Sequence, residues 1–283
     1  MGDLMTRILS KAKLGDDLYE FQLQAPKIAR ACQPGQFIIF RLHEKGERIP
    51  VTIADTNLDL GSISVVVQGV GKTTMELNRD YETGDDIRDV VGPLGNPSEI
   101  DTYGRVVAIG GGVGIAIIFP IVKALKEAGN EVISILGAQT ENKLFYRDKI
   151  ARTSDRVIVT TDDGSAGRKG FTTDAFKEVL GSQKVDMSWA IGPVVMMKYC
   201  TQIAEEFDTE IIVSLNSIMV DGTGMCGGCR VTVGSESKFA CVDGPEFVGS
   251  QVDFELLSQR TETYRDKEEC ALEQFVEKES RDG

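Results

Sequence analysis

The 283-residue sequence contains a single histidine, His43. A mechanism built on a histidine dyad is therefore nearly excluded, and so is a metal site with several imidazole ligands. Lysine and arginine (31 residues) are outnumbered by aspartate and glutamate (44 residues), which gives a net charge of −13. An acidic surface disfavours nucleic acid and anionic membranes as partners. Proline is scarce (8 residues) and glycine frequent (30 residues), a composition that disfavours long disordered segments.

Long apolar runs are also missing. The longest, such as residues 115–122, are too short to span a bilayer, and this one contains Pro120. The N-terminus has no charged-then-apolar signal segment. The spacing of the six cysteines is closer to that of a metal site than to that of a secreted disulfide scaffold, which fits a reducing compartment. We therefore expect a cytoplasmic protein, long enough for two domains with real cores.

Residues 1–100 are predicted to form an antiparallel β-barrel. Short alternating runs of apolar and polar residues are separated by turn signals such as Pro34-Gly35 and Thr83-Gly-Asp85. Only residues 73–79 have the pattern of a helix. Several short strands with one helix are typical of a small closed barrel. The predicted strands are Arg7–Lys13, Leu18–Gln24, Phe37–Leu42, Val51–Asp55 and Ser62–Val67.

Two segments of this half have the composition of a binding element. In Arg48-Ile-Pro50-Val51-Thr52 an arginine, a rigid turn and a hydroxyl alternate, so this segment could clamp a pyrophosphate and hydrogen-bond the edge of a flavin. Gly71-Lys-Thr73-Thr74 opens the predicted helix, where free N–H groups bind anions. Both segments also have ordinary interpretations, namely an exposed turn and a helix capped by Thr73.

Residues 101–215 are predicted to form a doubly wound parallel sheet, because apolar strands alternate with helices along the chain. The predicted strands are Arg105–Ile109, Glu131–Leu136, Arg156–Thr160, Ser188–Ile191 and Glu210–Ser214. The predicted helices are Ile117–Ala128, Leu144–Ala151, Thr172–Leu180 and Val194–Glu206. Ligands of such sheets bind where the strands end at their carboxyl edge.

A glycine turn, Gly110-Gly111-Gly112-Val-Gly114, follows the first of these strands. It lacks the dinucleotide fingerprint Gly-x-Gly-x-x-Gly/Ala, because Ile115 stands at the third position. The turn still allows a pyrophosphate to approach the backbone closely. Gly192-Pro193, after the fourth strand, is a candidate for contact with a nicotinamide ring.

Asp163 follows the third strand and could hold the adenosine ribose of a nucleotide. A carboxylate there would repel a 2′-phosphate and so favours NAD over NADP, although Arg168 and Lys169 act in the opposite direction. The alternative is that Asp162-Asp163-Gly164 is a plain surface turn.

The densest group of metal-binding side chains lies in Asp221-Gly-Thr-Gly-Met-Cys226-Gly-Gly-Cys229, with Cys241 beyond it. The spacing resembles the Cys-x4-Cys-x2-Cys run of plant-type iron–sulfur loops, with an aspartate in place of the first cysteine. The glycines tolerate positive φ and let N–H groups approach a cluster. Two short strands, Arg230–Val233 and Ser237–Cys241, would return Cys241 to the loop as a hairpin. We interpret this segment as an iron–sulfur site, with structural zinc and a chance cluster as alternatives.

The remaining cysteines, Cys32, Cys200 and Cys270, stand alone in the sequence and are expected to be buried apolar residues. We assign residues 216–250 to the cluster loop and its hairpin, and residues 251–283 to a charged helical tail. The tail is either a helix that packs against its own chain or a docking helix for a partner subunit.

The order of barrel, doubly wound domain and cluster loop resembles the ferredoxin–NADP reductase superfamily. Residues 5–250 are similar to the branch that contains the electron-transfer subunit of NAD-dependent dihydroorotate dehydrogenase. The resemblance implies FAD in the barrel, NAD(H) in the sheet domain and a [2Fe–2S] cluster held by Asp221, Cys226, Cys229 and Cys241. The implied FAD-binding residues are Arg48, Pro50, Val51, Thr52, Gly71, Thr73 and Thr74, and the implied nucleotide-binding residues are Gly111, Gly112, Gly114, Asp163 and Gly192.

The sequence departs from that branch at two places. Asp221 replaces the first of four cysteines, and Ile49 separates Arg48 from Pro50 where the branch has an Arg-Pro pair. With the long charged tail, these differences make the chain more similar to the small subunits of NADH-dependent reduced ferredoxin:NADP oxidoreductases, some of which are called sulfide dehydrogenase subunits. That resemblance implies a heterodimer and flavin-based electron bifurcation. The large subunit would hold another FAD and two [4Fe–4S] clusters, and would handle ferredoxin and NADP(H).

The predicted function is an electron relay between NAD(H), FAD and the [2Fe–2S] cluster. A flavin is required because nicotinamide transfers two electrons together whereas the cluster accepts one. No side chain is predicted to act as a catalytic acid, base or nucleophile. One alternative keeps the cofactors but passes electrons to a dihydroorotate dehydrogenase partner. Another is a non-enzymatic zinc-binding module.

Overall fold

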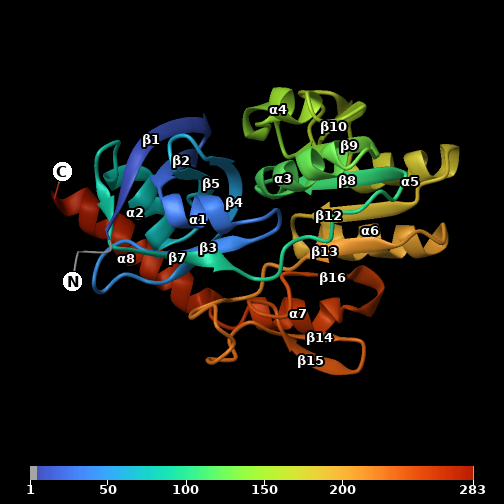
Figure 1. Ribbon diagram of the computed structural model, residues 1–283. Helices are drawn as coiled ribbons and strands as arrows, with labels where there is room; N and C mark the ends of the chain where they lie inside the picture. The colour runs from blue at the N-terminus through green and yellow to red at the C-terminus, as the bar shows by residue number, and fades with distance from the viewer. Residues whose placement is uncertain (1–4, 283) are drawn as a thin grey trace.

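The computed structural model describes the backbone of residues 5–282 and the side chains of residues 5–276. It consists of a β-barrel, an α/β domain and a smaller C-terminal lobe beneath them (Figure 1). This arrangement confirms the predicted fold class. No helix within the described residues is both long and apolar enough to cross a membrane.

The barrel is a seven-stranded antiparallel sheet in the order β6-β1-β2-β5-β4-β3-β7. Its two edge strands, β6 and β7, are separated in the chain only by Arg88, so the sheet nearly closes on itself. Side chains such as Phe21, Ile38 and Phe40 fill its interior. The strands are β1 (Thr6–Gly15), β2 (Leu18–Gln24), β3 (Phe37–Arg41), β4 (Ile49–Asn57), β5 (Ser62–Gln68), β6 (Asp86–Ile87) and β7 (Asp89–Leu94).

Two helices accompany the barrel where the sequence predicted one. The predicted helix is α2 (Lys72–Asp80). The additional helix, α1 (Pro26–Ala31), has only six residues, and proline at its first position suits a helix start. Its buried residues Ile28 and Ala29 join the barrel core. So short a helix leaves no periodic pattern in the sequence, which explains why it was missed.

The α/β domain has a seven-stranded sheet in the order β11-β10-β9-β8-β12-β13-β16. All neighbouring strands are parallel except the last pair, β13 and β16. The strands are β8 (Arg105–Gly111), β9 (Glu131–Ala138), β10 (Arg156–Thr161), β11 (Arg168–Lys169), β12 (Met187–Ile191), β13 (Ile211–Ser214) and β16 (Glu246–Val248). The helices are α3 (Gly114–Glu127), α4 (Arg147–Ala151), α5 (Thr172–Ser182) and α6 (Val194–Glu206), with a 3₁₀ turn η1 (Glu141–Lys143).

The helix predicted over Leu144–Ala151 begins only at Arg147. Tyr146 adopts a left-handed conformation (φ 58°) directly before it, which a helix cannot include. Burial explains this local strain, because the Tyr146 ring packs edge-on against Phe119 and Phe145.

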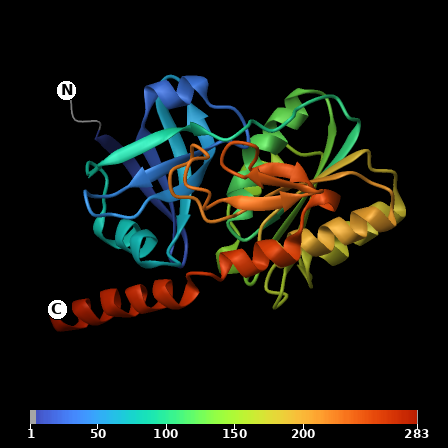
Figure 2. The ribbon, with the colours of Figure 1, turned by 90° about the horizontal axis from the view of Figure 1, so that it is seen from below.

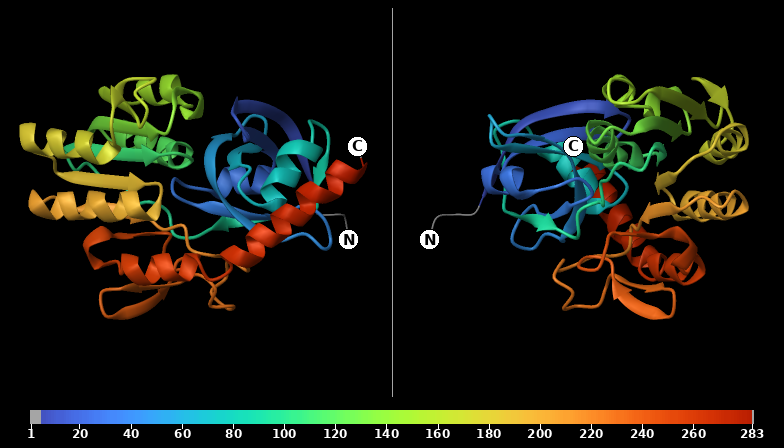
Figure 3. Two further views of the ribbon diagram at one scale, coloured as in Figure 1. Left: turned by 180° about the vertical axis from the view of Figure 1, so that it is seen from behind. Right: turned by 45° about the vertical axis from the view of Figure 1, so that its right-hand side comes forward.

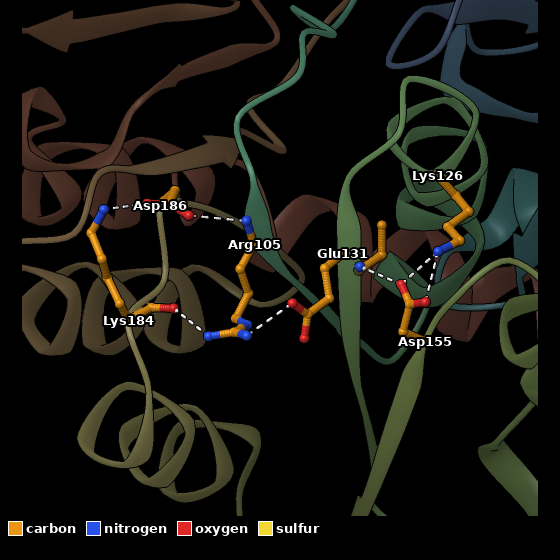
Figure 4. A network of polar contacts seen from close by, with 7 residues as sticks. Arg105, Lys126, Glu131, Asp155, Lys184 and Asp186 are labelled. Carbon is orange, nitrogen blue, oxygen red and sulfur yellow. Dashed lines mark hydrogen bonds and ion pairs between the residues drawn. The ribbon is translucent and has the colours of Figure 1, made fainter.

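The amino-terminal ends of the parallel strands are joined by charged side chains (Figure 4). Arg105 pairs with Glu131 at 2.9 Å, and its backbone N–H donates to Asp186 at 3.0 Å. Lys126 reaches both carboxylate oxygens of Asp155 at 2.7 Å. These contacts fasten the edge of the sheet that lies opposite the expected ligand edge, so we interpret them as stabilising rather than functional.

The barrel and the α/β domain share an apolar interface. Leu18, Ala54 and Val66 of the barrel belong to the same buried cluster as helix α3. At its margin, the Tyr146 hydroxyl donates to Glu20 Oε1 at 2.6 Å and Lys149 Nζ lies 3.1 Å from the same oxygen. The two domains are therefore held together by buried area and by a polar contact.

The C-terminal lobe consists of the hairpin β14 (Arg230–Val233) and β15 (Glu236–Phe239), the 3₁₀ turn η2 (Gly249–Gln251) and helix α7 (Phe254–Thr261). Its buried residues join the core beneath the α/β sheet. Helix α8 (Arg265–Asp282) then runs away from the lobe to the barrel and lies beside α2 (Figures 2 and 3). The Phe275 ring lies under the Arg79 guanidinium, and its centroid is 4.6 Å from the guanidinium carbon Cζ. The tail therefore packs against its own chain.

Candidate functional site

The loop before β14 is shaped by its glycines and by one carboxylate. Gly222, Gly224 and Gly227 have φ between 70° and 79°, a range that non-glycine residues rarely adopt. The Asp221 carboxylate accepts the backbone N–H groups of Thr223 and Cys226, each at 2.8 Å. These hydrogen bonds, that of Thr223 foremost, lower the pKa of Asp221, so its carboxylate is charged at neutral pH.

The hairpin returns Cys241 to the loop, as predicted. The Cys229 and Cys241 Sγ atoms lie 3.1 Å apart, and the N–H of Ala240 donates to the Cys229 carbonyl at 3.0 Å. Both side chains are buried. Burial, with the adjacent Cys229 thiol, raises the pKa of Cys241 to about 12. A metal centre is the kind of charge that would hold this thiol deprotonated, since metal ligation removes thiol protons outright.

The four predicted ligands are only partly assembled. Cys226 is exposed, and its Sγ accepts the Gly228 N–H at 3.5 Å. Among the described residues, no three His, Cys, Asp or Glu side chains converge closely enough to hold a metal ion. The donor set nevertheless fits an iron–sulfur centre, because three thiols and a charged carboxylate come from one glycine-rich loop and its hairpin.

The three solitary cysteines have different environments. Cys200 is fully buried in the core of the α/β domain, as expected, and Cys32 is partly buried. Cys270 is exposed on α8, so the expectation that it is buried was wrong.

A cavity of about 250 Å³ joins the barrel to this loop. Arg48, a predicted flavin ligand, and Asp221, a predicted cluster ligand, both line it. Its wall also contains the ion pair between Arg41 and Asp89, which face each other across β3 and β7. Sequence reasoning missed this pair, because no local spacing signals a contact between residues so far apart in the chain. The remaining lining residues are Ile39, Phe40 and Val91.

The two predicted flavin-binding segments are joined by a hydrogen bond. The buried Thr73 hydroxyl donates to the carboxylate of Glu47, the residue before Arg48. Pro50, Val51 and Thr52 lie on β4, paired with β3. Glu47 was not recognised from the sequence. Its charge did not indicate a role in binding, because Glu47 lies in a turn with other charged residues.

Thr73 does not cap α2, contrary to one interpretation of the sequence. Gly71 is the N-cap residue, and the Thr74 hydroxyl accepts the backbone N–H groups of Val70 and Gly71 at 3.1 and 3.0 Å. Thr74 thus organises the helix start, which leaves Thr73 to reach Glu47.

The predicted nucleotide-binding glycines lie at two adjacent strand-to-helix turns. Strands β8 and β12 are neighbours, and the strand order reverses between them, which is where such sheets bind ligands. A Cβ atom on Gly114 would overlap the Ile191 carbonyl oxygen. A Cβ on Gly111 would lie 2.5 Å from Met196 Sδ, and one on Gly192 would lie 2.7 Å from Met196 Cε.

Gly112 differs from the other glycines of this turn. It has a φ of +56°, and nothing lies within 4 Å of the position of a Cβ atom. Gly111, Gly114 and Gly192 therefore serve close packing, whereas Gly112 leaves open space at the turn that a nucleotide would approach.

Asp163 lies beyond β10 in an exposed loop. Its Oδ1 accepts the backbone N–H and the hydroxyl of Ser165 at 2.9 and 2.6 Å. These hydrogen bonds lower the pKa of Asp163 and keep it charged. The structure therefore brings Gly111, Gly112, Gly114 and Gly192 together and gives Asp163 a fixed loop of its own.

Two family models match the chain at the segments that the sequence singled out. Residues 216–253 match the iron–sulfur cluster binding domain of dihydroorotate dehydrogenase B, and residues 108–202 match an oxidoreductase NAD-binding domain. The chain is 53% identical over 275 residues to a dihydroorotate dehydrogenase B electron-transfer subunit homolog of Thermotoga maritima, with 97% of each chain covered.

The chain belongs to the dihydroorotate dehydrogenase B electron-transfer subunit family. A more distant member of this family, a probable electron-transfer subunit of Methanocaldococcus jannaschii, is 37% identical over 78% of the chain and 81% of that protein.

Solved structures extend the comparison. A structure of the NADH-dependent reduced ferredoxin–NADP oxidoreductase, described for flavin-based electron bifurcation, contains a chain that is 52% identical. The two chains superpose with a TM-score of 0.91, and the match covers 98% of the present chain and 100% of the solved chain. Phthalate dioxygenase reductase, 18% identical over 82% of the chain and 87% of its own, has the same fold (TM-score 0.59).

These comparisons confirm the predicted superfamily and branch. They confirm that this electron-transfer subunit family member is an oxidoreductase subunit with an iron–sulfur domain and an NAD-binding domain. The ferredoxin-reductase fold of its structural neighbours agrees with the predicted cofactor set of FAD, [2Fe–2S] and NAD(H).

Proposed function

We propose that this chain is the small subunit of an electron-bifurcating NADH-dependent ferredoxin:NADP oxidoreductase. In this function it carries electrons between NAD(H), FAD and a [2Fe–2S] cluster. The observation that supports the relay best is the cavity that Arg48 and Asp221 line together, since it connects the proposed flavin site to the proposed cluster loop. The full-length likeness to a bifurcating enzyme at 52% identity supports the choice of complex.

The chain's own residues have distinct tasks in this proposal. Arg48 and the start of α2 bind the FAD pyrophosphate, and Thr52 and the β4 backbone hold the flavin edge. The turns at Gly112 and Gly192 receive the nicotinamide half of NAD(H), and Asp163 receives its adenosine ribose. Asp221, Cys226, Cys229 and Cys241 hold the cluster. When bound, FAD exchanges electrons in pairs with nicotinamide and singly with the cluster.

The surface beside the cluster loop supports a partner subunit. Three apolar side chains are exposed there, namely Val220, Met225 and Val242. Val242 and Val220 flank Gly224 and Gly228 of the loop, and Met225, at 87% exposure, lies between Gly224 and the exposed Cys226. Exposed apolar side chains grouped at one place are typical of a contact with another protein. We propose the large subunit, with its own FAD and two [4Fe–4S] clusters, as that protein.

A second candidate is the electron-transfer subunit of an NAD-dependent dihydroorotate dehydrogenase, which the name of the 53% identical Thermotoga maritima relative favours. Asp221 in the first ligand position favours the bifurcating enzyme instead. A zinc-binding module is the weakest candidate, because the lobe matches an iron–sulfur domain.

The deciding experiment is anaerobic purification with any bound subunit, followed by iron, sulfide and flavin analysis and a visible spectrum. The complex should then reduce ferredoxin with NADPH only when NAD is present, and should leave dihydroorotate unoxidised. Oxidation of dihydroorotate would select the second candidate. A colourless protein that contains zinc would overturn both.

A further inference from the structure

The segment between the two large domains is fastened on both sides. Residues 95–104 leave the barrel after β7 and enter the α/β sheet at β8 (Figure 1). The Ser98 N–H donates to the Pro34 carbonyl of the barrel at 2.8 Å. The Asn96 N–H donates to the Gly244 carbonyl of the C-terminal lobe at 2.6 Å. Barrel, linker and lobe therefore meet at one junction.

Glu246, the first residue of β16, lies at this junction. Its Oε1 accepts the Ser98 hydroxyl of the linker at 2.6 Å, and its Oε2 accepts the indole N–H of Trp189 at 3.4 Å. Trp189 is buried in the centre of the α/β sheet. Gly35 of the barrel fits against the same pair, since a Cβ atom on it would overlap Ser98 Oγ and lie 3.0 Å from Glu246 Oε1. One carboxylate thus contacts all parts of the junction.

The environment of Glu246 makes its charge costly. Burial raises the pKa of Glu246 to about 7, against the opposing effect of the hydrogen bonds from Ser98 and Trp189. The nearby titratable phenol is Tyr103, which packs edge-on against Trp189. Its own pKa is raised by burial and by Glu99, Asp101, Glu210 and Glu246. No cation of the described residues contributes to the pKa shift of Glu246.

A glutamine could bond the same two neighbours without the cost of a buried charge, by accepting the indole N–H of Trp189 and donating its amide N–H to the Ser98 hydroxyl oxygen. The hydrogen bonds alone therefore do not explain why this junction between the two domains contains a carboxyl group. We infer that Glu246 is a positioning residue. Its protonated form keeps the flavin-binding barrel and the nucleotide-binding domain in the relative orientation that electron transfer requires. Its ionised form weakens the contacts of the junction. This inference rests on the proposed function, because it assigns a flavin to the barrel.

The test compares hydrogen exchange of residues 95–104 at pH 6 and pH 8, corrected for the intrinsic pH dependence of exchange, in the cofactor-loaded protein. In the wild type, residues 95–104 should open about tenfold more often at pH 8 than at pH 6. The closed junction raises the pKa of Glu246 and the open junction does not, so ionisation of Glu246 favours opening. Glu246→Gln should remove this pH dependence, and Glu246→Leu should raise exchange at both pH values. Glu236→Gln is the matched control, since it removes one exposed carboxylate from the same lobe and should change nothing.

A second readout is the stopped-flow rate of flavin reduction by NADH. In Glu246→Leu this rate should fall at least about tenfold while the Kd for a non-reducible NAD analogue stays unchanged, because misplacement of the reacting groups is costly. Unaltered linker exchange and unaltered rates in both Glu246 variants would overturn the inference. If the wild-type flavin is not reduced by NADH at all, the proposed function fails, and the exchange data still decide whether Glu246 holds the junction.

Discussion

The Cys229 and Cys241 Sγ atoms lie 3.1 Å apart, although twelve positions separate these residues in the chain. The hairpin of β14 and β15 brings them together, and the pairing of Arg230 with Phe239 fixes its register. The contact therefore follows from the pairing of β14 with β15.

Replacing either of these two cysteines by serine should remove the iron–sulfur centre. We expect the iron and sulfide content of Cys229→Ser and Cys241→Ser to fall by at least about half, because the loop alone lacks enough thiolates for a two-iron cluster. Cys270→Ser is the control, since Cys270 is exposed on α8. Equal loss of iron in the control would show that the assay reports damage unrelated to ligation.

Asp221→Cys should keep the iron but change the reduction potential of the cluster. A carboxylate oxygen is a harder donor than a thiolate, and first-sphere ligands set the potential. The potential and the electron paramagnetic resonance spectrum provide the measurement. If neither changes, Asp221 acts only through its hydrogen bonds to Thr223 and Cys226.

Two glycines of one turn should respond differently to alanine. Gly114→Ala should lower the free energy of unfolding by about 3 kcal/mol, because the added methyl overlaps the Ile191 carbonyl in a tightly packed turn. Gly112→Ala should lower the free energy of unfolding by only about 1–2 kcal/mol. The added methyl meets open space, so the only destabilising effect is the positive φ of an alanine. Urea unfolding measures both. Calorimetric titration of an NAD analogue should show weaker binding to Gly112→Ala, and unchanged affinity would remove Gly112 from the nucleotide site.

The stability of the protein should depend on Glu246 over a defined pH range. Its pKa is raised from an ordinary value of 4.5 to about 7 in the folded protein. Protonated Glu246 therefore contributes its full share of the free energy of unfolding below pH 4.5. That contribution is lost as the pH rises towards 7 and amounts to roughly 3 kcal/mol in total. Urea unfolding of wild type and Glu246→Gln between pH 5 and pH 8 measures it, and parallel curves would show that the native pKa is not raised.

The contact between α8 and the barrel should depend on Phe275. Phe275→Ala removes the ring under the Arg79 guanidinium and should weaken the docking of α8 by about 1 kcal/mol. Hydrogen exchange over residues 265–282 should then increase. Val276→Ala, at an exposed neighbouring position, serves as the control. Unchanged exchange in Phe275→Ala would mean that other contacts hold the helix.

The elements with regular patterns could be predicted from the sequence. Helix α6 has the predicted bounds of Val194–Glu206, because its buried residues recur at helical spacing, and strand β2 has those of Leu18–Gln24, because Phe21 and Leu23 alternate with polar residues. Strand β16 was missed, since three residues are too few to show alternation. It pairs antiparallel with β13, so part of the segment assigned to the cluster loop completes the sheet of the α/β domain.

The candidate site was predictable where its residues are close in sequence. The cluster loop and the glycine turn are each continuous segments, whereas Arg41–Asp89, Thr73–Glu47 and Ser98–Glu246 join distant ones. Such contacts are set by strand pairing and by loop paths, which no local pattern encodes. Thr73 shows the limit most directly, because the sequence does not indicate that Gly71 is the N-cap residue or which of the two adjacent threonines bonds to the helix start.

Strand β16 makes the iron–sulfur lobe inseparable from the sheet beside it. Transplanting residues 216–253 into another reductase would carry β16 without its native partner β13 and so risk an unpaired strand edge, a known cause of aggregation. A recombinant chimera should therefore take its crossover before Ile211, so that β13 and β16 travel together. For protein engineers, the transferable module is larger than the cysteine motif.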